Sequence, residues 1–561
     1  MEEQGKTGVF LCNCGKKLAG KIDFSALAEV ARGKPDVAFV VETELLCQPD
    51  GLKLLAEKAK TEGVDRIVVA ACSPRLYEET FASAASAGIN PNMVRVCNIR
   101  EQCAWRIDDK ASATETAKKV LSAGLNRARL SVPIEEEEIE VNKKVLVIGG
   151  GVAGIQSAIE IVNFGYDVTL IEKTPELGGL VSGLSGLYQT ETSPKDFLGV
   201  RLESIERNEQ IEVLTNSSVY YASGSLGDFN VRLETPEGRM TDKFGAVVVA
   251  TGMEPKYDRG LYGVDLGERF VTQFGFEQLL ADEEKAKAML ARGEDGKRKR
   301  AVIVIGMGEE DSKLSSANML KHALKLRRDF DCEVYVAARH VKVAASELER
   351  MYTEAREEGV VFFKFLDPST ISLSAEDGAK VSILDPLLVD ENLNDYSVEM
   401  QCDLVILEET YSPDGSHEYL EHVLGARPGP RGFYQEDNPH LLPIRTSNRG
   451  VFVVGSAREP MLIPDVLVDA GAVAGEVHLA LSGGRIPVKN ELVRVIKGKC
   501  VLCLNCKRVC PHAAISYGAA AIISETACQA CGVCVAVCPN LAITYANETN
   551  EIYDVELESL V

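Results

Sequence analysis

Short apolar runs alternate with longer amphipathic stretches along most of the chain. Between Asn142 and Lys173, an apolar run at 145–148 precedes an amphipathic segment, and a second apolar run follows at 168–171. Short apolar runs bounded by turn residues are typical of buried strands, and the segment between them has helical spacing. The pattern predicts a strand–turn–helix–strand unit.

The same alternation predicts an α/β unit over residues 8–128, with four strands separated by helices. These strands are expected at Val9–Leu11, Val37–Val41, Arg66–Ala70 and Met93–Val96. Polar and apolar residues alternate from Asn208 to Arg239, which predicts short strands returning to the sheet. Lys299–Leu326 begins as a second strand-and-glycine unit.

The turn after the run at 145–148 carries glycine at the three places of a dinucleotide-binding fingerprint. Gly149 suits a tight turn, Gly151 lets backbone approach a pyrophosphate, and Gly154 lets the helix pack on the strand. Unpaired N–H groups at the helix start favour phosphate. Glu172, after the second strand, can accept hydrogen bonds from an adenosine ribose. The alternative is an ordinary strand–helix turn, but the complete unit favours dinucleotide binding.

Composition narrows the class of protein. The chain has 561 residues, which indicates three or four domains, and its net charge of −23 argues against a nucleic-acid surface. No apolar run has membrane-spanning length, and no signal peptide is evident at Met1. The expected location is cytoplasmic. The seven histidines have neither triad nor metal-ligand spacing.

Fourteen of the sixteen cysteines gather at the two ends of the chain. Near the carboxyl end, two C-x-x-C-x-x-C-x-x-x-C-P runs follow each other, the pattern of a bacterial ferredoxin in which the fourth cysteine serves the other cluster. The first predicted 4Fe–4S cluster takes Cys500, Cys503, Cys506 and Cys538. The second takes Cys528, Cys531, Cys534 and Cys510. Zinc would explain four ligands per ion, but not the duplication.

The cysteines near the amino end lie at or just after predicted strands. They are Cys12, Cys14, Cys47, Cys72 and Cys103. Carboxyl ends of parallel strands meet at one edge of a sheet, so four thiolates there could hold a third iron–sulfur cluster. Buried apolar cysteines are the alternative. Cys332 and Cys402 are expected to be isolated thiols.

Two later segments change the picture of the central region. FGAVVVATG, at 244–252, and RGVFVVGS, at 449–456, resemble the two-dinucleotide-domain flavoproteins that include thioredoxin reductase. This resemblance implies FAD in the first fingerprint. The cofactor-binding residues it implies are Gly149, Gly151, Gly154, Glu172, Lys173, Gly179, Ala250, Thr251, Gly252, Gly455 and Asp465.

The amino-terminal segments GVFLCNCG, VVAACSPR and INPNMVRVCNIREQCAW resemble the A-type subunit of heterodisulfide reductase, and the central region fits the same family. The resemblance implies an amino-terminal 4Fe–4S cluster. Its favoured ligands are Cys14, Cys47, Cys72 and Cys103, with Cys12 as the alternate, and Cys97 is expected to be a bystander. Because no cysteine lies between Cys103 and Cys332, the chain is expected to be a short form without the family's inserted ferredoxin domain.

The second strand-and-glycine unit is expected to have lost its NAD(P)H site. It has Gly306 and Gly308 but no third glycine, and the acidic run 309–311 would repel a phosphate. Cysteines that relatives carry in the next helix are replaced here by Ser315, Met319 and Leu320. The family resemblance assigns Lys325 a place beside the flavin N5, as the catalytic residue. Without that resemblance, Lys325 is an ordinary exposed lysine.

The predicted architecture is α/β throughout, with four parts. They are an α/β cluster domain at 1–130, an acidic linker at 131–142, a thioredoxin-reductase-like FAD domain at 143–488 with a degenerate NAD(P)-type subdomain at about 255–400, and an α+β ferredoxin domain with two clusters at 489–561. The run Glu135–Glu138 is interpreted as a solvated spacer.

These features predict an oxidoreductase subunit that passes electrons between FAD and 4Fe–4S clusters. The family resemblance adds partners: heterodisulfide reductase B- and C-like subunits, an input module (a hydrogenase, a formate dehydrogenase or an NADH-oxidising flavoprotein) and ferredoxin. It also implies anaerobic flavin-based electron bifurcation and dimers of a larger complex. One alternative is a self-contained NAD(P)H-dependent FAD/iron–sulfur oxidoreductase, and another is a non-catalytic scaffold. The terminal acceptor stays open.

Overall fold

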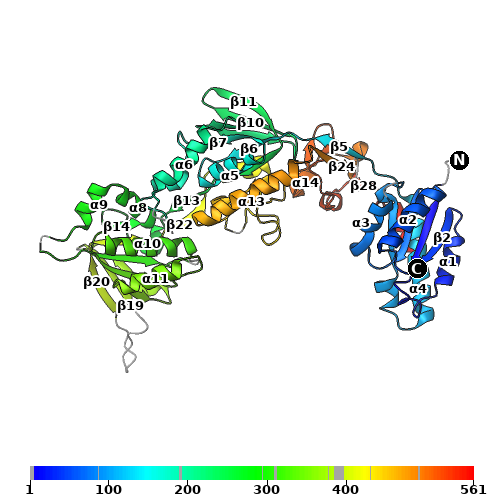
Figure 1. Cartoon of the computed structure of the whole chain (residues 1–561), viewed down its shortest axis with the longest axis horizontal. Helices are drawn as coiled ribbons and strands as arrows, with labels where there is room; N and C mark the ends of the chain where they lie inside the picture. The colour runs from blue at the N-terminus through cyan, green and yellow to red at the C-terminus, as the bar shows by residue number, and fades with distance from the viewer. Residues whose placement is uncertain are drawn as a thin grey trace. The chain divides into compact units, whose positions relative to one another are not determined.

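The protein, seen here as a computed structural model, divides into two compact units (Figure 1). The first comprises Met1–Ile139, Pro487–Cys510 and Ala514–Val561, and the second Glu140–Ile486 and Pro511–Ala513. The structure describes residues 5–85, 88–188, 192–293, 295–308, 312–376, 378–384, 397–429, 431–489 and 493–561. The predicted acidic run 309–311 therefore lies outside the described residues.

A four-stranded parallel sheet forms the amino-terminal part of the first unit, and its order is β2-β1-β3-β4. The strands are β1 (Thr7–Cys12), β2 (Val37–Thr43), β3 (Arg66–Ala71) and β4 (Val94–Asn98). The helices are α1 (Phe24–Arg32), α2 (Pro49–Glu62), α3 (Pro74–Ala85) and α4 (Lys110–Leu130). The central strands β1 and β3 are almost wholly buried because both faces of the sheet are covered. The four predicted strands are confirmed.

The carboxyl-terminal part of the same unit is small and has one short helix within each of the two cysteine runs. Its strands pair antiparallel as β25 with β28 and β26 with β27. The elements are β25 (Val493–Val495), α14 (Asn505–Val509), β26 (Ile515–Tyr517), β27 (Ala521–Ile523), α15 (Val533–Ala536), β28 (Ile543–Tyr545) and α16 (Asn550–Leu560).

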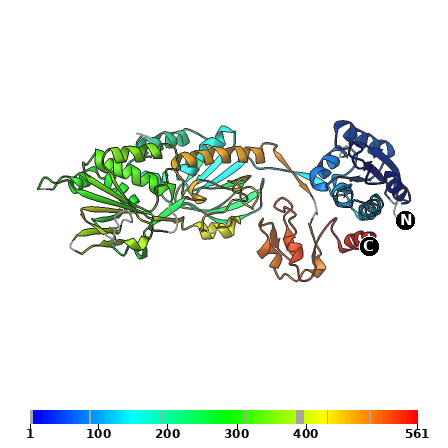
Figure 2. The ribbon, with the colours of Figure 1, turned by 90° about the horizontal axis from the view of Figure 1, so that it is seen from below.

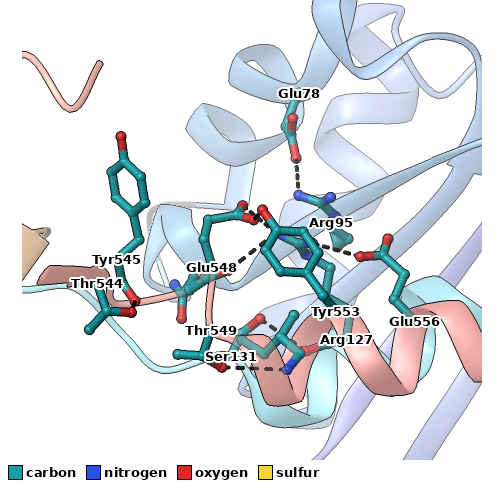
Figure 3. A network of polar contacts seen from close by, with 12 residues as sticks. Glu78, Arg95, Arg127, Ser131, Thr544, Tyr545, Glu548, Thr549, Tyr553 and Glu556 are labelled. Atoms are coloured by element: carbon teal, nitrogen blue, oxygen red, sulfur yellow. Dashed lines mark hydrogen bonds and ion pairs between the residues drawn. The ribbon is translucent and has the colours of Figure 1, made fainter. Parts of the chain in front are cut away.

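Helix α16 packs along α4, which joins the two parts of the first unit (Figure 3). Arg127, on α4, has a side chain only 5% exposed and forms ion pairs with Glu548 and, at 2.7 Å, with Glu556. Its guanidinium also lies 5.6 Å from the centre of the Tyr553 ring. Two carboxylates and an aromatic face offset the cost of burying this charge.

A five-stranded parallel sheet in the order β23-β12-β6-β7-β8 begins the second unit. Its strands are β6 (Lys144–Ile148), β7 (Asp167–Ile171), β8 (Ile211–Leu214), β12 (Ala246–Val249) and β23 (Val451–Val453). Helices α5 (Val152–Asn163), α6 (Pro194–Glu206) and α13 (Ile463–Leu481) accompany it, and α13 packs against α5. The predicted returning strands form an antiparallel sheet of β9 (Ser218–Ser223), β10 (Phe229–Thr235) and β11 (Gly238–Phe244).

A second parallel sheet has the same spatial arrangement, in the order β14-β21-β15-β16-β17 (green in Figure 2). Its edge strand β14 precedes the other four strands in sequence, whereas β23 follows the other four strands of the first sheet. Its strands are β14 (Phe270–Thr272), β15 (Arg300–Ile305), β16 (Glu333–Ala338), β17 (Val361–Lys364) and β21 (Leu404–Leu407). Its helices are α8 (Gln273–Ala281), α9 (Glu283–Leu290), α10 (Lys313–Arg328) and α11 (Leu348–Glu357). The antiparallel strands are β18 (Ile371–Ser374), β19 (Ala379–Leu384) and β20 (Ser397–Cys402).

The two domains of the second unit are joined by the antiparallel pair β13 (Met253–Lys256) and β22 (Thr410–Pro413). Strand β13 follows β12, where the chain leaves the first domain, and β22 follows β21, where it returns. The pair therefore brings the carboxyl ends of β12 and β21 close together. Short helices α7 (Arg259–Tyr262) and α12 (His417–Leu424) flank it in sequence. Strand β24 (Arg485–Lys489) follows α13. The acidic linker contains β5 (Glu136–Glu140), whose five side chains are all exposed.

Candidate functional site

The glycine turn between β6 and α5 shows why each glycine is needed. Gly149 has φ +110°, and an added Cβ would lie 2.4 Å from the carbonyl oxygen of Ala250. A Cβ on Gly154 would lie 1.8 Å from the carbonyl oxygen of Gly149, so the helix approaches the strand too closely for a side chain. A Cβ on Gly151 would meet nothing closer than 4.0 Å. The space beside Gly151 is therefore open, as an approaching pyrophosphate requires.

Glu172, the acid predicted to bind the ribose, also forms a hydrogen bond that holds the glycine turn in place. Glu172 is 9% exposed, and its Oε2 accepts a hydrogen bond of 2.6 Å from the Gly150 N–H. Its Oε1 accepts hydrogen bonds from the N–H and hydroxyl of Thr174, each at 2.8 Å. These donors hold the carboxylate at the end of β7, beside the glycine turn.

Two adjoining cavities open around this turn, with volumes of about 450 and 350 Å³. Both are lined by Gly149, Glu172, Lys173, Thr251 and Asp414. The first extends past β9 toward Tyr220 and Tyr419. The second passes Gly151 and the 178–188 segment and reaches α10 of the other domain. An elongated cofactor such as FAD needs one space for its adenosine and another for its ring, and each volume is typical of a ligand site.

Most of the predicted cofactor-binding residues line these cavities. They are Gly149, Gly151, Glu172, Lys173, Gly179, Ala250, Thr251 and Gly252. The Thr251 hydroxyl is buried without a hydrogen-bond partner among the residues that the structure describes, which suits a polar ligand in the cavity. The donors and the space fit FAD.

Three predicted residues have other positions. Gly154 supports the packing of α5, and the Gly455 N–H donates a hydrogen bond to Asp469 at 2.9 Å. The neighbouring Ser456 lines the second cavity. Asp465 pairs with Lys313 at 2.5 Å, and Ile463 and Val466 provide the lining from this turn of α13. The Gly-Ser dipeptide was the signal that could have identified Ser456.

The end of the second cavity toward α10 carries charged side chains that sequence reasoning missed. Lys321 and Glu277 both line it and form an ion pair of 2.8 Å with little exposure, 13% for the lysine and 1% for the glutamate. Glu277 also contacts His322 and accepts from the Ser185 N–H at 2.8 Å. Burial alone would raise the pKa of Glu277, but His322 and Lys321 outweigh it and hold the pKa below its usual range.

Lys325, the predicted flavin lysine, lies one helical turn beyond Lys321. Its side chain is 37% exposed and pairs with Asp329 at 3.0 Å, in the i,i+4 geometry of a surface helix. The cavity lining from α10 comes instead from Leu314, Asn318 and Lys321. The structure therefore brings Lys321 to the site and leaves Lys325 at the helix surface.

The first ferredoxin cysteine set surrounds a single small pocket. Cys500, Cys503, Cys506 and Cys538 all line it, which is the crossed set that the spacing predicts. Backbone N–H groups point at the sulfurs: Ala542 N donates to Cys538 Sγ at 3.2 Å, and the amides of Ala521 and Leu502 lower the pKa of Cys500. Donors of this kind stabilise thiolates bound to a cluster.

The second set also consists of mutual neighbours. Burial raises the pKa of Cys534 to about 11, and the nearby thiols of Cys528, Cys510 and Cys531 add to this rise. In the part of the chain that the structure describes, no three His, Cys, Asp or Glu side chains are close enough to hold one metal ion.

The amino-terminal cysteines separate into two groups. Burial raises the pKa of Cys12, and the thiols of Cys14 and Cys47 raise it further; Cys47 likewise contributes to the raised pKa of Cys72. Cys12, Cys14, Cys47 and Cys72 are therefore neighbours at the carboxyl edge of the sheet. The Arg100 guanidinium donates to Cys14 Sγ at 3.6 Å and also lies near Cys72.

Cys103 belongs to the other group. It is fully buried in the same core cluster as Cys97, its thiol faces the Asn98 carbonyl oxygen at 3.9 Å, and burial raises its pKa to about 11. Cys97 packs under α4, where a Cβ on Gly124 would lie 2.1 Å from its sulfur. The thiols that act on the pKa of Cys12 are thus those of Cys14 and Cys47, whereas Cys103 adds to the rise that burial causes in the pKa of Cys97. Cys14 also packs against the core cluster that holds Cys97 and Cys103.

Paired cavities on a dinucleotide-binding fold, together with two complete cysteine sets, define an oxidoreductase that carries a flavin and iron–sulfur clusters. Residues 143–466 match the family described as pyridine nucleotide-disulphide oxidoreductase, and residues 492–552 match the family described as 4Fe-4S dicluster domain. The first match covers more than half of the chain, so the protein belongs to the pyridine nucleotide-disulphide oxidoreductase family. FAD and 4Fe–4S clusters are its cofactors.

Curated relatives match almost the whole chain. One is an iron-sulfur A-type subunit of the CoB–CoM heterodisulfide reductase of Methanopyrus kandleri, 26% identical over 91% of this chain and 90% of its own. Another is the A-type subunit of the H2/formate:CoB–CoM heterodisulfide,ferredoxin reductase of Methanococcus maripaludis, 26% identical over 91% of each chain. The resemblance to the A-type subunits of heterodisulfide reductases is confirmed, and the protein is an electron-transfer flavoprotein of this kind.

Among solved structures, thioredoxin reductase of T. acidophilum aligns with 60% of this chain and 99% of its own, at 15% identity and a TM-score of 0.41. The matched families and the repeated strand order together confirm the predicted fold class, with two dinucleotide-type domains and a dicluster tail. Within the described ranges, no helix combines the length and apolar character needed to cross a membrane.

Proposed function

We propose that this protein passes electrons between its FAD and its 4Fe–4S clusters as one component of a larger complex. The proposed partners are heterodisulfide reductase B- and C-like subunits, an input module such as a hydrogenase, a formate dehydrogenase or an NADH-oxidising flavoprotein, and ferredoxin. Names of relatives support this choice, because one belongs to an H2/formate:CoB–CoM heterodisulfide,ferredoxin reductase. A cytoplasmic location and assembly as a dimer of a larger complex belong to the same proposal.

The observation that carries the proposal is the combination of a two-part cavity with two crossed cysteine sets in one chain. Bound FAD supplies a change between two-electron and one-electron transfer, and each cluster carries one electron. The residues of the chain bind and orient these groups: the glycine turn receives the pyrophosphate, Glu172 holds the ribose, and the eight carboxyl-terminal cysteines hold the clusters.

At the ring end of the cavity we assign to Lys321 the role predicted for Lys325. Its ammonium lies in the cavity lining and is fixed by Glu277 and by the Gly186 carbonyl oxygen at 3.0 Å. A fixed cation there favours electrons on the flavin and can donate a hydrogen bond to it. Electron bifurcation at this flavin is part of the proposal.

For the amino-terminal cluster we propose Cys12, Cys14, Cys47 and Cys72 as ligands. Cys14 and Cys47 raise the pKa of Cys12, Cys47 raises that of Cys72, and Arg100 lies near Cys14 and Cys72. Cys103 instead lies in the core with Cys97, whose pKa is raised by burial and further by Cys103. Arg100 would offset part of the negative charge of such a cluster.

The second domain offers one observation against a nucleotide site and one in favour. Glu408 follows β21, and its carboxylate accepts the Gly306 N–H at 2.6 Å, so a negative charge occupies the turn where a pyrophosphate would bind. Arg339 follows β16, in the place that Glu172 has after β7, and an arginine there suits the 2′-phosphate of NADPH. The alternative of a self-contained NAD(P)H-dependent oxidoreductase rests on that arginine.

Two measurements on anaerobically purified protein test the proposal. About twelve iron atoms per FAD are expected if all three clusters are present, and about eight if the amino-terminal cysteines hold none. Addition of NADH or NADPH should leave the oxidised flavin absorbance unchanged. Rapid bleaching by either nucleotide would favour the self-contained oxidoreductase, and near-absence of iron would overturn the electron-transfer role.

A further inference from the structure

Glu409 is a buried carboxyl group with one unsatisfied oxygen at the flavin cavity. It follows β21, lines the cavity, and is 3% exposed. Its Oε1 accepts a hydrogen bond from the Phe274 N–H at 2.9 Å and one from the Tyr411 hydroxyl at 3.3 Å. Its Oε2 is buried and has no partner among the described residues.

A buried carboxyl oxygen without a hydrogen-bond partner lowers the stability of the folded protein, so this arrangement needs a physical reason. The same cavity is also lined by Thr251, whose buried hydroxyl likewise has no partner within the described ranges. A ligand in the cavity can satisfy both groups. A flavin ring presents nitrogen and carbonyl acceptors along one edge, and these match a protonated carboxyl group, which donates through its O–H.

The charges around Glu409 favour the protonated form. Among the described residues, no positive charge faces its carboxyl group: the groups that donate hydrogen bonds to it, and lower its pKa by doing so, are the uncharged backbone of Gln273 and Phe274 and the hydroxyls of Thr272 and Tyr411. Its titratable neighbours are Tyr262 and Tyr411, with Glu408 adjacent in sequence. Across the cavity wall, Lys321 is already paired with Glu277. Burial outweighs these hydrogen bonds and raises the pKa of Glu409 from 4.5 to about 7.

We propose that Glu409 holds the proton that the flavin ring takes up on reduction, a role that rests on the electron-transfer function proposed above. Two electrons reach the ring from the reduced 4Fe–4S clusters, while the O–H bond of Glu409 breaks and its proton passes to the ring. The carboxylate that remains is stabilised by the Phe274 N–H and the Tyr411 hydroxyl. On reoxidation, the ring returns the electrons to the clusters and the proton to Glu409.

This assignment gives the two adjacent glutamates different tasks. Glu408 is engaged by the Gly306 N–H in the second domain, whereas Glu409 faces the flavin cavity. The pair therefore supplies its own control: Glu409→Gln and Glu408→Gln make the same chemical change at neighbouring positions. Glutamine keeps the acceptor oxygen and the size of the side chain but cannot release a proton to the ring.

The test uses the full-length, FAD-loaded protein with its clusters, reduced by light with an external electron donor. Infrared difference spectra of protein labelled with ¹³C-glutamate should lose a protonated-carboxyl band in the same phase as the oxidised flavin absorbance. The rate of flavin reduction should fall as pH rises through about 7. In Glu409→Gln the band should be absent and the rate about a hundredfold lower and independent of pH. Glu408→Gln should behave as the natural protein, and Glu409→Asp should restore part of the rate.

An unchanged carboxyl band and an unchanged pH profile in Glu409→Gln would overturn the assignment. FAD content and the oxidised flavin spectrum, measured first, show whether each variant folds and binds its cofactor. Iron content and the response to NADPH on the same preparation test the electron-transfer function separately. A normal cofactor content with an unaltered Glu409→Gln profile would therefore reject only the role of Glu409.

Discussion

The two dinucleotide-type domains of the second unit share one strand order but differ where a ligand would bind. Strands β6, β7, β8, β12 and β23 occupy the same order as β15, β16, β17, β21 and β14. After β12 the chain continues as Ala250-Thr251-Gly252, which leaves the cavity open beside the glycine turn. After β21 the chain continues as Glu408-Glu409. The Glu408 carboxylate binds the glycine turn of its own domain, whereas Glu409 lines the cavity of the neighbouring domain.

The comparison shows that two domains with the same strand order can differ in the residues that line their glycine turns. The strand order depends on apolar runs, which both domains retain, whereas a nucleotide site depends on a few backbone N–H groups and on small residues near them. In the second domain, the Glu408 carboxylate accepts the hydrogen bond of the Gly306 N–H in the glycine turn. Two residues of the second domain, Lys321 on α10 and Glu409 just after β21, line the flavin cavity of the first domain.

The largest predicted effect is on FAD binding, which should depend on the glycine turn of the first domain and not on that of the second. Gly154→Ala places a Cβ 1.8 Å from a backbone oxygen, so we expect the first turn to shift and FAD binding to be lost. Gly308→Ala, in the second turn, meets nothing within 4 Å and should leave the FAD content unchanged. Flavin released by denaturation measures both. Equal FAD content in the two variants would contradict the assignment of the flavin to the first turn.

A second prediction compares two lysines of α10. Lys321→Ala leaves Glu277 buried beside the flavin without its lysine, which should lower the free energy of unfolding by about 3 kcal/mol and lower the flavin midpoint potential. Lys325→Ala removes only an exposed pair and should change stability by less than about 0.5 kcal/mol. Thermal unfolding and a spectroelectrochemical titration provide the measurements. A potential that responds to Lys325 but not to Lys321 would restore the original assignment.

A third prediction concerns pH. Because the pKa of Glu409 is raised from 4.5 to about 7, the folded protein retains a proton in this window that the unfolded chain has released. The stability of the FAD-free protein should therefore fall as pH rises from 4.5 to 7. Glu409→Gln should be more stable than the natural protein above pH 7, by about 3 kcal/mol at most, and equal to it at low pH. Calorimetric melting across this range would show whether the two curves diverge.

The smallest predicted effect tests the second turn directly. Glu408→Ala frees the Gly306 N–H and removes a negative charge, so NADPH affinity should rise by about tenfold, with Arg339 available for the 2′-phosphate. Fluorescence titration with NADPH measures this change, and Glu333→Ala, at a partly exposed position on β16, serves as the charge-matched control. If the natural protein already binds NADPH tightly, Glu408 does not close the site.

The sequence was most informative where spacing alone determines geometry. Gly149, Gly151 and Gly154 act through backbone contacts a few residues away, and the eight ferredoxin cysteines are placed by short, fixed turns. Both could be predicted because local chain geometry limits where these residues can lie. The repeated strands were equally predictable from their apolar runs.

Other parts of the site depend on long-range packing. Lys321 and Lys325 differ by one helical turn, and the packing of α10 against the first domain decides which lysine enters the cavity. Glu409 reaches the site only because β13 and β22 bring the two domains together. Cys12 and Cys103 could not be ranked from spacing, since the core around Cys97 determines which thiol is enclosed. The docking of α16 through Arg127 has no signal in either local segment.

The central claim is that electrons move between the FAD and the clusters of this chain. The most direct measurement is time-resolved: flavin in the full-length protein is reduced by light, and samples frozen at successive times are examined by electron paramagnetic resonance. The account predicts that signals of reduced 4Fe–4S clusters grow as the flavin returns to its oxidised form. A flavin that stays reduced beside intact clusters that remain oxidised would contradict it.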